Sequence, residues 1–65
     1  MVSYAPLWAT MKEKNISTYA LIKNHNIQSK TIYNLKHDKN ISTATLENLC
    51  DILECTPNDV LTFKK

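Results

Sequence analysis

The chain has 65 residues, 43% of them hydrophobic, and a formal net charge of +2 at pH 7. A chain of this length forms one domain with a small core, which depends on tight helix packing or self-association for its stability. It has no run near the ~20 apolar residues that cross a bilayer, and its start lacks the basic and apolar regions of a secretory signal. We therefore expect a single domain over residues 1–65 that is cytoplasmic and does not bind membranes.

The first predicted helix covers residues 6–15, PLWATMKEKN. Pro6 suits the first helical position, where its missing N–H group would have no partner anyway. Leu7, Trp8 and Met11 follow at helical spacing. We expect this stripe, tryptophan included, to face the core.

The second predicted helix covers residues 17–25, STYALIKNH. Ser17 is expected to be its N-cap, because a serine hydroxyl accepts an N–H group of the first turn. Leu21 and Ile22 are expected to face inward. Asn26 then suits a left-handed turn, since asparagine tolerates a positive φ best after glycine.

The third predicted helix covers residues 28–37, QSKTIYNLKH. Ile32 and Leu35 are three positions apart and are expected to point into the core. The other faces of this helix are polar and basic. A loop is expected over residues 37–42.

The last part of the chain carries the clearest amphipathic pattern. A fourth helix is predicted over residues 42–54, capped by Ser42 or Thr43, with a stripe formed by Leu46, Leu49, Cys50 and Leu53. Thr56 is expected to cap a short fifth helix that begins at Pro57. Its apolar contacts are expected to be Val60, Leu61 and Phe63.

The charges are divided along the chain. Residues 1–40 contain six lysines against Glu13 and Asp38, whereas residues 41–63 contain four acidic residues and no basic one. This division indicates one face for a polyanion and another for a different contact. The chain has no arginine, so lysine and amide side chains would have to do more of any base reading.

The segment over residues 17–40 has the pattern of a helix-turn-helix. It joins a capped helix, a short turn with Asn26 and Ile27, and a second helix with two inward residues. A tight turn holds such helices at a steep angle and leaves the outer face of the second one free to enter a major groove.

Three segments carry a resemblance to a known family: YAPLW at residues 4–8, ALIKNHNIQSKTIYNLK at residues 20–36, and ISTATLENLCDILECTPNDVL at residues 41–61. In these the chain resembles the Xre family of helix-turn-helix regulators related to phage Cro and lambda repressor, and especially its small single-domain members. The resemblance implies an all-α, five-helix lambda-repressor-like bundle. Its second and third helices would form the DNA-binding unit of a sequence-specific transcriptional regulator, expected to be a repressor.

The same resemblance marks the side chains that would read base edges: Gln28, Ser29, Lys30, Thr31, Tyr33 and Asn34. Their chemistry agrees with that role. Gln28 and Asn34 can pair bidentately with adenine, and Lys30 can reach the acceptors of guanine. Tyr33 can touch a thymine methyl group or donate to a phosphate.

The resemblance also marks contacts to the DNA backbone. Thr18, at the start of the second helix, corresponds to a phosphate contact, and Lys36, Lys39 and Asn40 lie where the family touches the backbone. Lysines at such positions neutralise phosphates and fix the register of the protein on the duplex.

The chain departs from the family pattern at three places. Ile22 stands where the family often has alanine, and Asn26 stands where it often has glycine. The family also often ends its third helix at a glycine, and the equivalent position here is His37 or Asp38. These departures bear on the angle between the two helices of the motif.

The expected partner is double-stranded operator DNA, bound by a homodimer because one small module buries limited surface. Half-sites would be about one helical turn, ~34 Å, apart. The acidic second half of the chain and the apolar tail are the expected subunit contact; the tail residues are Val60, Leu61 and Phe63.

Other classes of function fit the sequence less well. A protein-interaction module of the same fold, antirepressor-like or antitoxin-like, is the alternative, but the basic and amide-rich third helix favours DNA. Cys50 and Cys55, with His25 and His37 far apart in the sequence, are a weak metal or redox signal. The sequence shows no nucleophile with a matching base and no glycine-rich phosphate loop, so we expect no enzyme, no cofactor and no small-molecule ligand.

Overall fold

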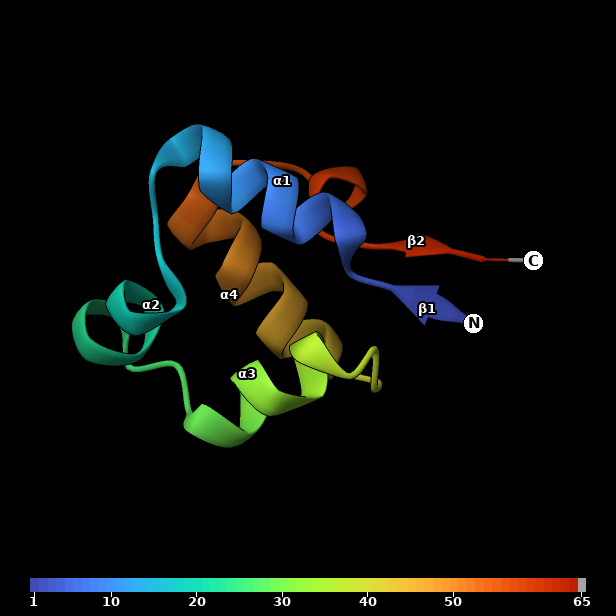
Figure 1. The fold of residues 1–65 in the computed structure, drawn as a ribbon, viewed down its shortest axis with the longest axis horizontal. Helices are drawn as coiled ribbons and strands as arrows, with labels where there is room; N and C mark the ends of the chain where they lie inside the picture. Colours follow the sequence, from blue (N-terminus) through green and yellow to red (C-terminus); the bar gives the residue numbers. More distant parts are fainter. Residues whose placement is uncertain (65) are drawn as a thin grey trace.

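The structure, a computed structural model, describes residues 1–64, so Lys65, the last residue of the predicted domain, lies outside the described residues. The elements in chain order are β1 (Val2–Ser3), α1 (Ala5–Lys14), α2 (Thr18–His25), α3 (Ser29–Lys36), α4 (Thr43–Leu53), the 3-10 turn η1 (Pro57–Asp59) and β2 (Thr62–Phe63). In Figure 1, α4 passes between α1 and α3, and β1 and β2 lie together at one end. None of the helices within this range is long and apolar enough to cross a membrane.

The predicted five-helix, all-α bundle is right for the first four helices only. The predicted fifth helix is the single turn η1, in which the Thr56 hydroxyl and backbone N–H both contact the Asp59 carboxylate. This capping box closes the turn, and Val60 follows it into the core with 0% exposure, so the helix does not continue.

The two ends of the described chain form a short antiparallel sheet that the sequence did not predict. Val2 pairs with Phe63, and Ser3 pairs with Thr62. Each strand has two residues, which is too short for the alternation of apolar and polar residues that reveals a strand in a sequence.

The predicted helix starts and stops are confirmed by hydrogen bonds. The Ser17 hydroxyl accepts the N–H of Ala20 at 3.1 Å, and the Ser42 hydroxyl accepts the N–H of Thr45 at 3.1 Å. Asn26 ends α2 with a φ of 57°, the left-handed conformation expected for it. The contacts of Ser17 and Asn26 define the length of α2, the helix that precedes α3.

The core is built from one or two large apolar side chains of each α-helix, together with Tyr4, Ile27 and Val60 just outside the helices. Those with exposures of 1% or less are Tyr4, Leu7, Leu21, Leu35, Leu49, Leu53 and Val60. Trp8 is half-buried and packs against this core. Ile22, expected to face inward, is 39% exposed, because Leu21 takes the core position and the next residue lies about 100° further around the helix.

Truncation of a leucine on the central helix tests this core. Leu49→Ala is expected to lower the free energy of unfolding by about 2–5 kcal/mol, because it removes buried methyl groups and leaves a cavity. Ile22→Ala, at the exposed position, is the control and should cost less than about 1 kcal/mol. Urea unfolding followed by circular dichroism measures both, and equal losses would contradict the observed burial.

Candidate nucleic-acid interface

The helix α3 lies along one side of the molecule, with its outer face turned away from α4 (Figure 1). Ile32 and Leu35 are 5% and 0% exposed, so they fix the rotation of this helix against the core. At about 100° per residue, the opposite side then carries Lys30, Tyr33 and His37. All three of these side chains are exposed.

The predicted base-reading residues therefore divide into two groups. Ser29 and Lys30 in the first turn, and the N-cap residue Gln28 before them, are exposed, as is Tyr33 with 53% of its surface. Thr31 and Asn34 are half-buried. Around the helix, Thr31 lies about 40° from the buried Leu35, on the flank of α3 nearer the core, whereas Asn34 lies about 40° from Lys30, on the outward side.

An aromatic and cationic cluster covers the end of α3. The rings of Tyr33 and His37 stack with centroids 4.2 Å apart and an angle of 39° between their planes. The Lys39 ammonium lies 5.7 Å from the centroid of the Tyr33 ring, within reach of a cation–π interaction. His37 was not among the predicted contacts, although its position four residues after Tyr33 places both on one helix face.

Tyr4 fixes the loop that follows α3. Its backbone N–H donates to the Asp38 carboxylate at 3.1 Å, and its hydroxyl donates to the Lys39 carbonyl at 2.7 Å. Asp38 adopts a φ of 53°, so of the two candidates for the family's glycine position it is Asp38 that takes the left-handed conformation. Burial, and next the charge of Asp38, raise the pKa of Tyr4. The buried tyrosine thus holds Lys39 beside Tyr33.

The outer surface of α2 adds a second aromatic and cationic pair. Tyr19 is 65% exposed, and the Lys23 ammonium donates to its hydroxyl at 3.1 Å while lying 5.5 Å from its ring centroid. Thr18, the predicted phosphate contact, is half-buried at the first position of this helix. Sequence reasoning missed Lys23, although its position four residues after Tyr19 places both side chains on one helix face.

The predicted backbone contacts do not form one cluster. Lys36 is exposed in the last turn of α3, and Lys39 lies over Tyr33. Asn40 instead lines a hollow beside β1 and β2. These three residues therefore extend from the last turn of α3 toward the end of the molecule that carries the strands.

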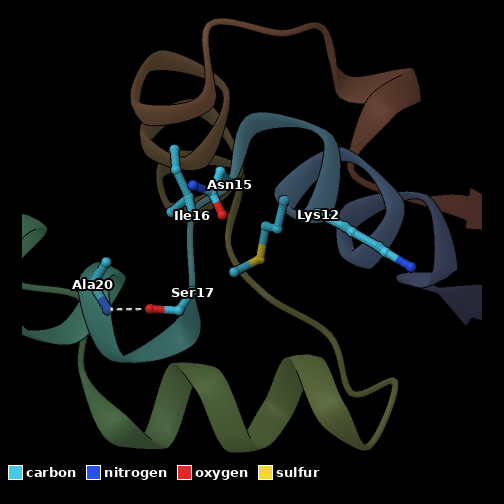
Figure 2. A pocket seen from close by; sticks show the side chains of 6 residues that line it. Lys12, Asn15, Ile16, Ser17 and Ala20 are labelled. Carbon is cyan, nitrogen blue, oxygen red and sulfur yellow. Dashed lines mark hydrogen bonds between the residues drawn. The ribbon is translucent and has the colours of Figure 1, made fainter.

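A shallow hollow of about 340 Å³ lies between the end of α1 and the start of α2 (Figure 2). The Ser17 hydroxyl in its wall already accepts the N–H of Ala20, and the Lys12 side chain extends away from Ser17. Asn15 at its edge has a φ of 58° and ends α1. The polar residues in the wall of the hollow thus serve to end α1 and to begin α2.

The two cysteines lie at the end of α4, away from the lysines of α3. Both are free and half-buried, and the backbone N–H of Cys55 donates to the carbonyl of Cys50 at 3.0 Å. Burial raises the pKa of both thiols, so little of either is present as the nucleophilic thiolate at neutral pH. Within residues 1–64 no three metal-ligating side chains come together.

The charges follow the fold. Lys23, Lys30, Lys36 and Lys39 lie on α2, on α3 and in the loop after α3, and all are exposed. The acidic residues of the second half of the chain lie on α4, at its end and on η1; they are Glu47, Asp51, Glu54 and Asp59. The surface of α3 is therefore basic, and the surface of α4 is acidic.

Comparisons with known proteins agree with this geometry. A family model described as the Cro/C1-type HTH DNA-binding domain matches residues 6–65, and the chain belongs to this family. The fold is similar to that in the crystal structure of the transcriptional regulator VanUg, Form II, with a TM-score of 0.86 and 24% identity over 94% of this chain and 81% of that one. A search of curated proteins found no match.

The two hydrogen bonds of Tyr4 to the loop after α3 predict a pH dependence of stability. Folding raises the pKa of the Tyr4 hydroxyl, so the protonated hydroxyl stabilises the folded state. This contribution is complete below the ordinary pKa of tyrosine, about 10, and is lost as the pH rises further. Tyr4→Phe should lower the free energy of unfolding by about 0.5–1.5 kcal/mol at pH 7, because the Lys39 carbonyl loses its donor. The gap in free energy of unfolding between the wild type and the variant should narrow above about pH 10.

Urea unfolding of both proteins between pH 7 and pH 11 measures this gap. All other side chains are the same in the two proteins, so their effects cancel in the difference. A gap that stays constant across this range would contradict the role assigned to the buried hydroxyl.

Proposed function

We propose that the protein is a sequence-specific regulator of transcription that places α3 in the major groove of double-stranded DNA. The observation that carries this proposal is the outward face of α3, which is polar, basic and exposed, while the opposite face is fixed by Ile32 and Leu35. A bound regulator excludes polymerase from an overlapping site, so we assign it the role of a repressor. Such a protein would act where its DNA is, and we place it in the cytoplasm.

The base-reading residues would be those at the start and on the outer side of α3. Gln28, Ser29 and Lys30 lie at the N-terminal end of the helix, which is the end that contacts base edges in helix-turn-helix proteins. Gln28 suits adenine, and Lys30 suits guanine. The half-buried Thr31 would reach bases from the flank of the helix, and the half-buried Asn34 from its outward side.

The phosphate contacts would lie on both sides of α3. Thr18 stands at the positive end of α2, where an anion is stabilised by the helix dipole and by free N–H groups. On the other side Lys36, Lys39 and Asn40 would hold the second strand, and the bond of Tyr4 to the Lys39 carbonyl limits the freedom of that loop. Fixing both sides sets the register of α3 in the groove.

The Tyr33–His37–Lys39 cluster would lie at the point where α3 leaves the groove. Tyr33 is more than half exposed, so its ring can touch a thymine methyl group or its hydroxyl can donate to a phosphate. His37 and Lys39 on the same ring add donors for phosphate oxygens.

We further propose that the protein binds as a homodimer on a two-fold symmetric operator. A single module of this kind buries about 600–1,000 Å² on DNA, less than specific dimeric complexes bury. Two copies on half-sites about one helical turn apart, ~34 Å, would double the contacts and read twice the sequence.

Selection from a random DNA library tests the proposed function directly. The wild-type protein should enrich a short symmetric site, and Lys30→Ala with Asn34→Ala should weaken binding to it by about tenfold or more. Lys14→Ala is the matched control, because it removes an exposed lysine from α1 on the other side of the molecule, and its binding should stay near that of the wild type.

The salt dependence of the same titrations separates DNA binding from a protein-interaction role. If the four lysines of α2, α3 and the following loop each neutralise a phosphate, the logarithm of affinity should fall steeply with that of salt, by about 0.9 per phosphate contact. Weak, salt-insensitive binding without an enriched site would overturn the regulator and point to a protein partner.

A further inference from the structure

The turn at the end of α4 brings the two cysteines of the chain together. Helix α4 ends at Leu53, and Glu54 follows it in the left-handed conformation, with a φ of 51°. The chain therefore turns back, and the backbone N–H of Cys55 donates to the carbonyl of Cys50 at 3.0 Å. A bond of this kind around a left-handed residue is typical of the Schellman motif, in which the side chains at the two ends often contact each other. Cys50 and Cys55 occupy these two ends.

The same hydrogen bond limits how far apart the two cysteines can be. With standard backbone bond lengths, an N···O distance of 3.0 Å holds the Cα atoms of Cys50 and Cys55 within about 7 Å of each other. Disulfides usually join Cα atoms that are about 4.4–6.8 Å apart. Each thiol is also among the causes of the shifted pKa of the other, so the two side chains are neighbours. The separation of the pair therefore suits a disulfide.

The surroundings of the pair favour the closed form over the reduced one. Both cysteine side chains are half-buried and pack against the core. Burial raises the pKa of both thiols, and the negative charge of Asp59 adds to this effect. A disulfide is easier to reduce when the protein stabilises the thiolates that reduction produces. Since this site does not stabilise them, the disulfide should be stable once formed, although its formation at neutral pH should be slow.

A disulfide at this place would tie the end of α4 to the segment that leads into η1. Thr56 directly follows Cys55 and caps η1, and the Asp59 carbonyl of η1 accepts the hydroxyl of Thr10 in α1 at 2.7 Å. The bond would also hold Glu54 in a left-handed conformation that is unfavourable for residues other than glycine. In Figure 1 the end of α4 lies on the side of α1 and away from α3. A closed bond would therefore brace the packing of α4, η1 and α1.

We propose that Cys50 and Cys55 form a reversible disulfide that makes the stability of this domain depend on the redox state of its surroundings. In a cytoplasm that keeps thiols reduced, such a bond forms only when low-molecular-weight disulfides accumulate, so it acts as a sensor and not as a permanent support. A domain of this size has little stability to spare, so one added bond changes its folded fraction. The pair lies away from α3, and the proposal is independent of the proposed binding to DNA.

The oxidant is a low-molecular-weight disulfide, of which oxidised glutathione is an example. The thiolate of one cysteine attacks a sulfur atom of this disulfide, so that a mixed disulfide forms and one low-molecular-weight thiolate leaves. The thiolate of the other cysteine then attacks the protein sulfur of the mixed disulfide and releases the second low-molecular-weight thiolate. Overall the pair loses two electrons and two protons. The oxidant gains the two electrons, and the two released thiolates take up the two protons.

Equilibration of the folded chain with mixtures of oxidised and reduced glutathione tests the proposal. In oxidised mixtures the wild type should lose both free thiols and the mass of two hydrogen atoms, and the reaction should be faster at higher pH, where more thiolate is present. Cys50→Ser and Cys55→Ser are the matched controls, because each keeps one thiol in place and should only gain one glutathione. A wild type that accumulates glutathione adducts, forms linked pairs of chains or keeps both thiols free would overturn the proposal.

Thermal unfolding of the same samples measures the consequence for stability. The oxidised wild type should unfold about 5–15 °C above the reduced wild type, because the bond restricts the unfolded chain and holds the turn at Glu54. Cys50→Ser combined with Cys55→Ser has no thiol and should unfold at one temperature in both mixtures, whatever its own stability. An oxidised wild type that unfolds at the same or a lower temperature than the reduced one would overturn the proposal. Neither experiment contains DNA, so this outcome would leave the proposed function unaffected.

Discussion

The pair of hydrogen bonds from Tyr4 to the loop after α3 is the constraint on which the DNA-binding surface depends. The backbone N–H and the hydroxyl of one buried residue reach Asp38 and the Lys39 carbonyl. The partners are 34 and 35 positions away in the chain, so this contact closes the fold around α3. It also joins the segment that follows β1 to the loop at the end of α3.

The chain makes its tight turns without glycine. Asn15, Asn26, Asp38 and Glu54 all have a positive φ, and each follows a helix. A left-handed residue other than glycine costs about 1–2 kcal/mol, less for asparagine and aspartate, whose short polar side chains bond locally. The core therefore has to offset these costs, and at Asp38 the bond from the N–H of Tyr4 does part of that. The conformations of these residues fix where each helix ends.

Local chemistry was enough to predict most helix boundaries, whereas contacts between distant segments were not predictable. The Ser17 cap and the left-handed Asn26 follow from residue type and spacing. The pairing of Val2 with Phe63 depends on how the whole chain folds, and no periodic pattern marks two-residue strands. For the candidate site, the polar face of α3 was predictable. The half-buried state of Asn34 depends on the tertiary packing around α3, whereas the stacking of His37 on Tyr33 follows from a spacing of four residues and could have been predicted.

The distribution of charge gives the molecule a basic surface on α3, which we propose for DNA, and an acidic surface on α4. The most direct test of the central claim is nuclear magnetic resonance mapping of the backbone amides on addition of the selected duplex. The account predicts that the shifts concentrate at the start of α2, along α3 and in the loop after it, and that the acidic helix α4 is little affected. Shifts centred on α4 or on α1, with α3 unchanged, would contradict the assignment of α3 as the helix that reads DNA.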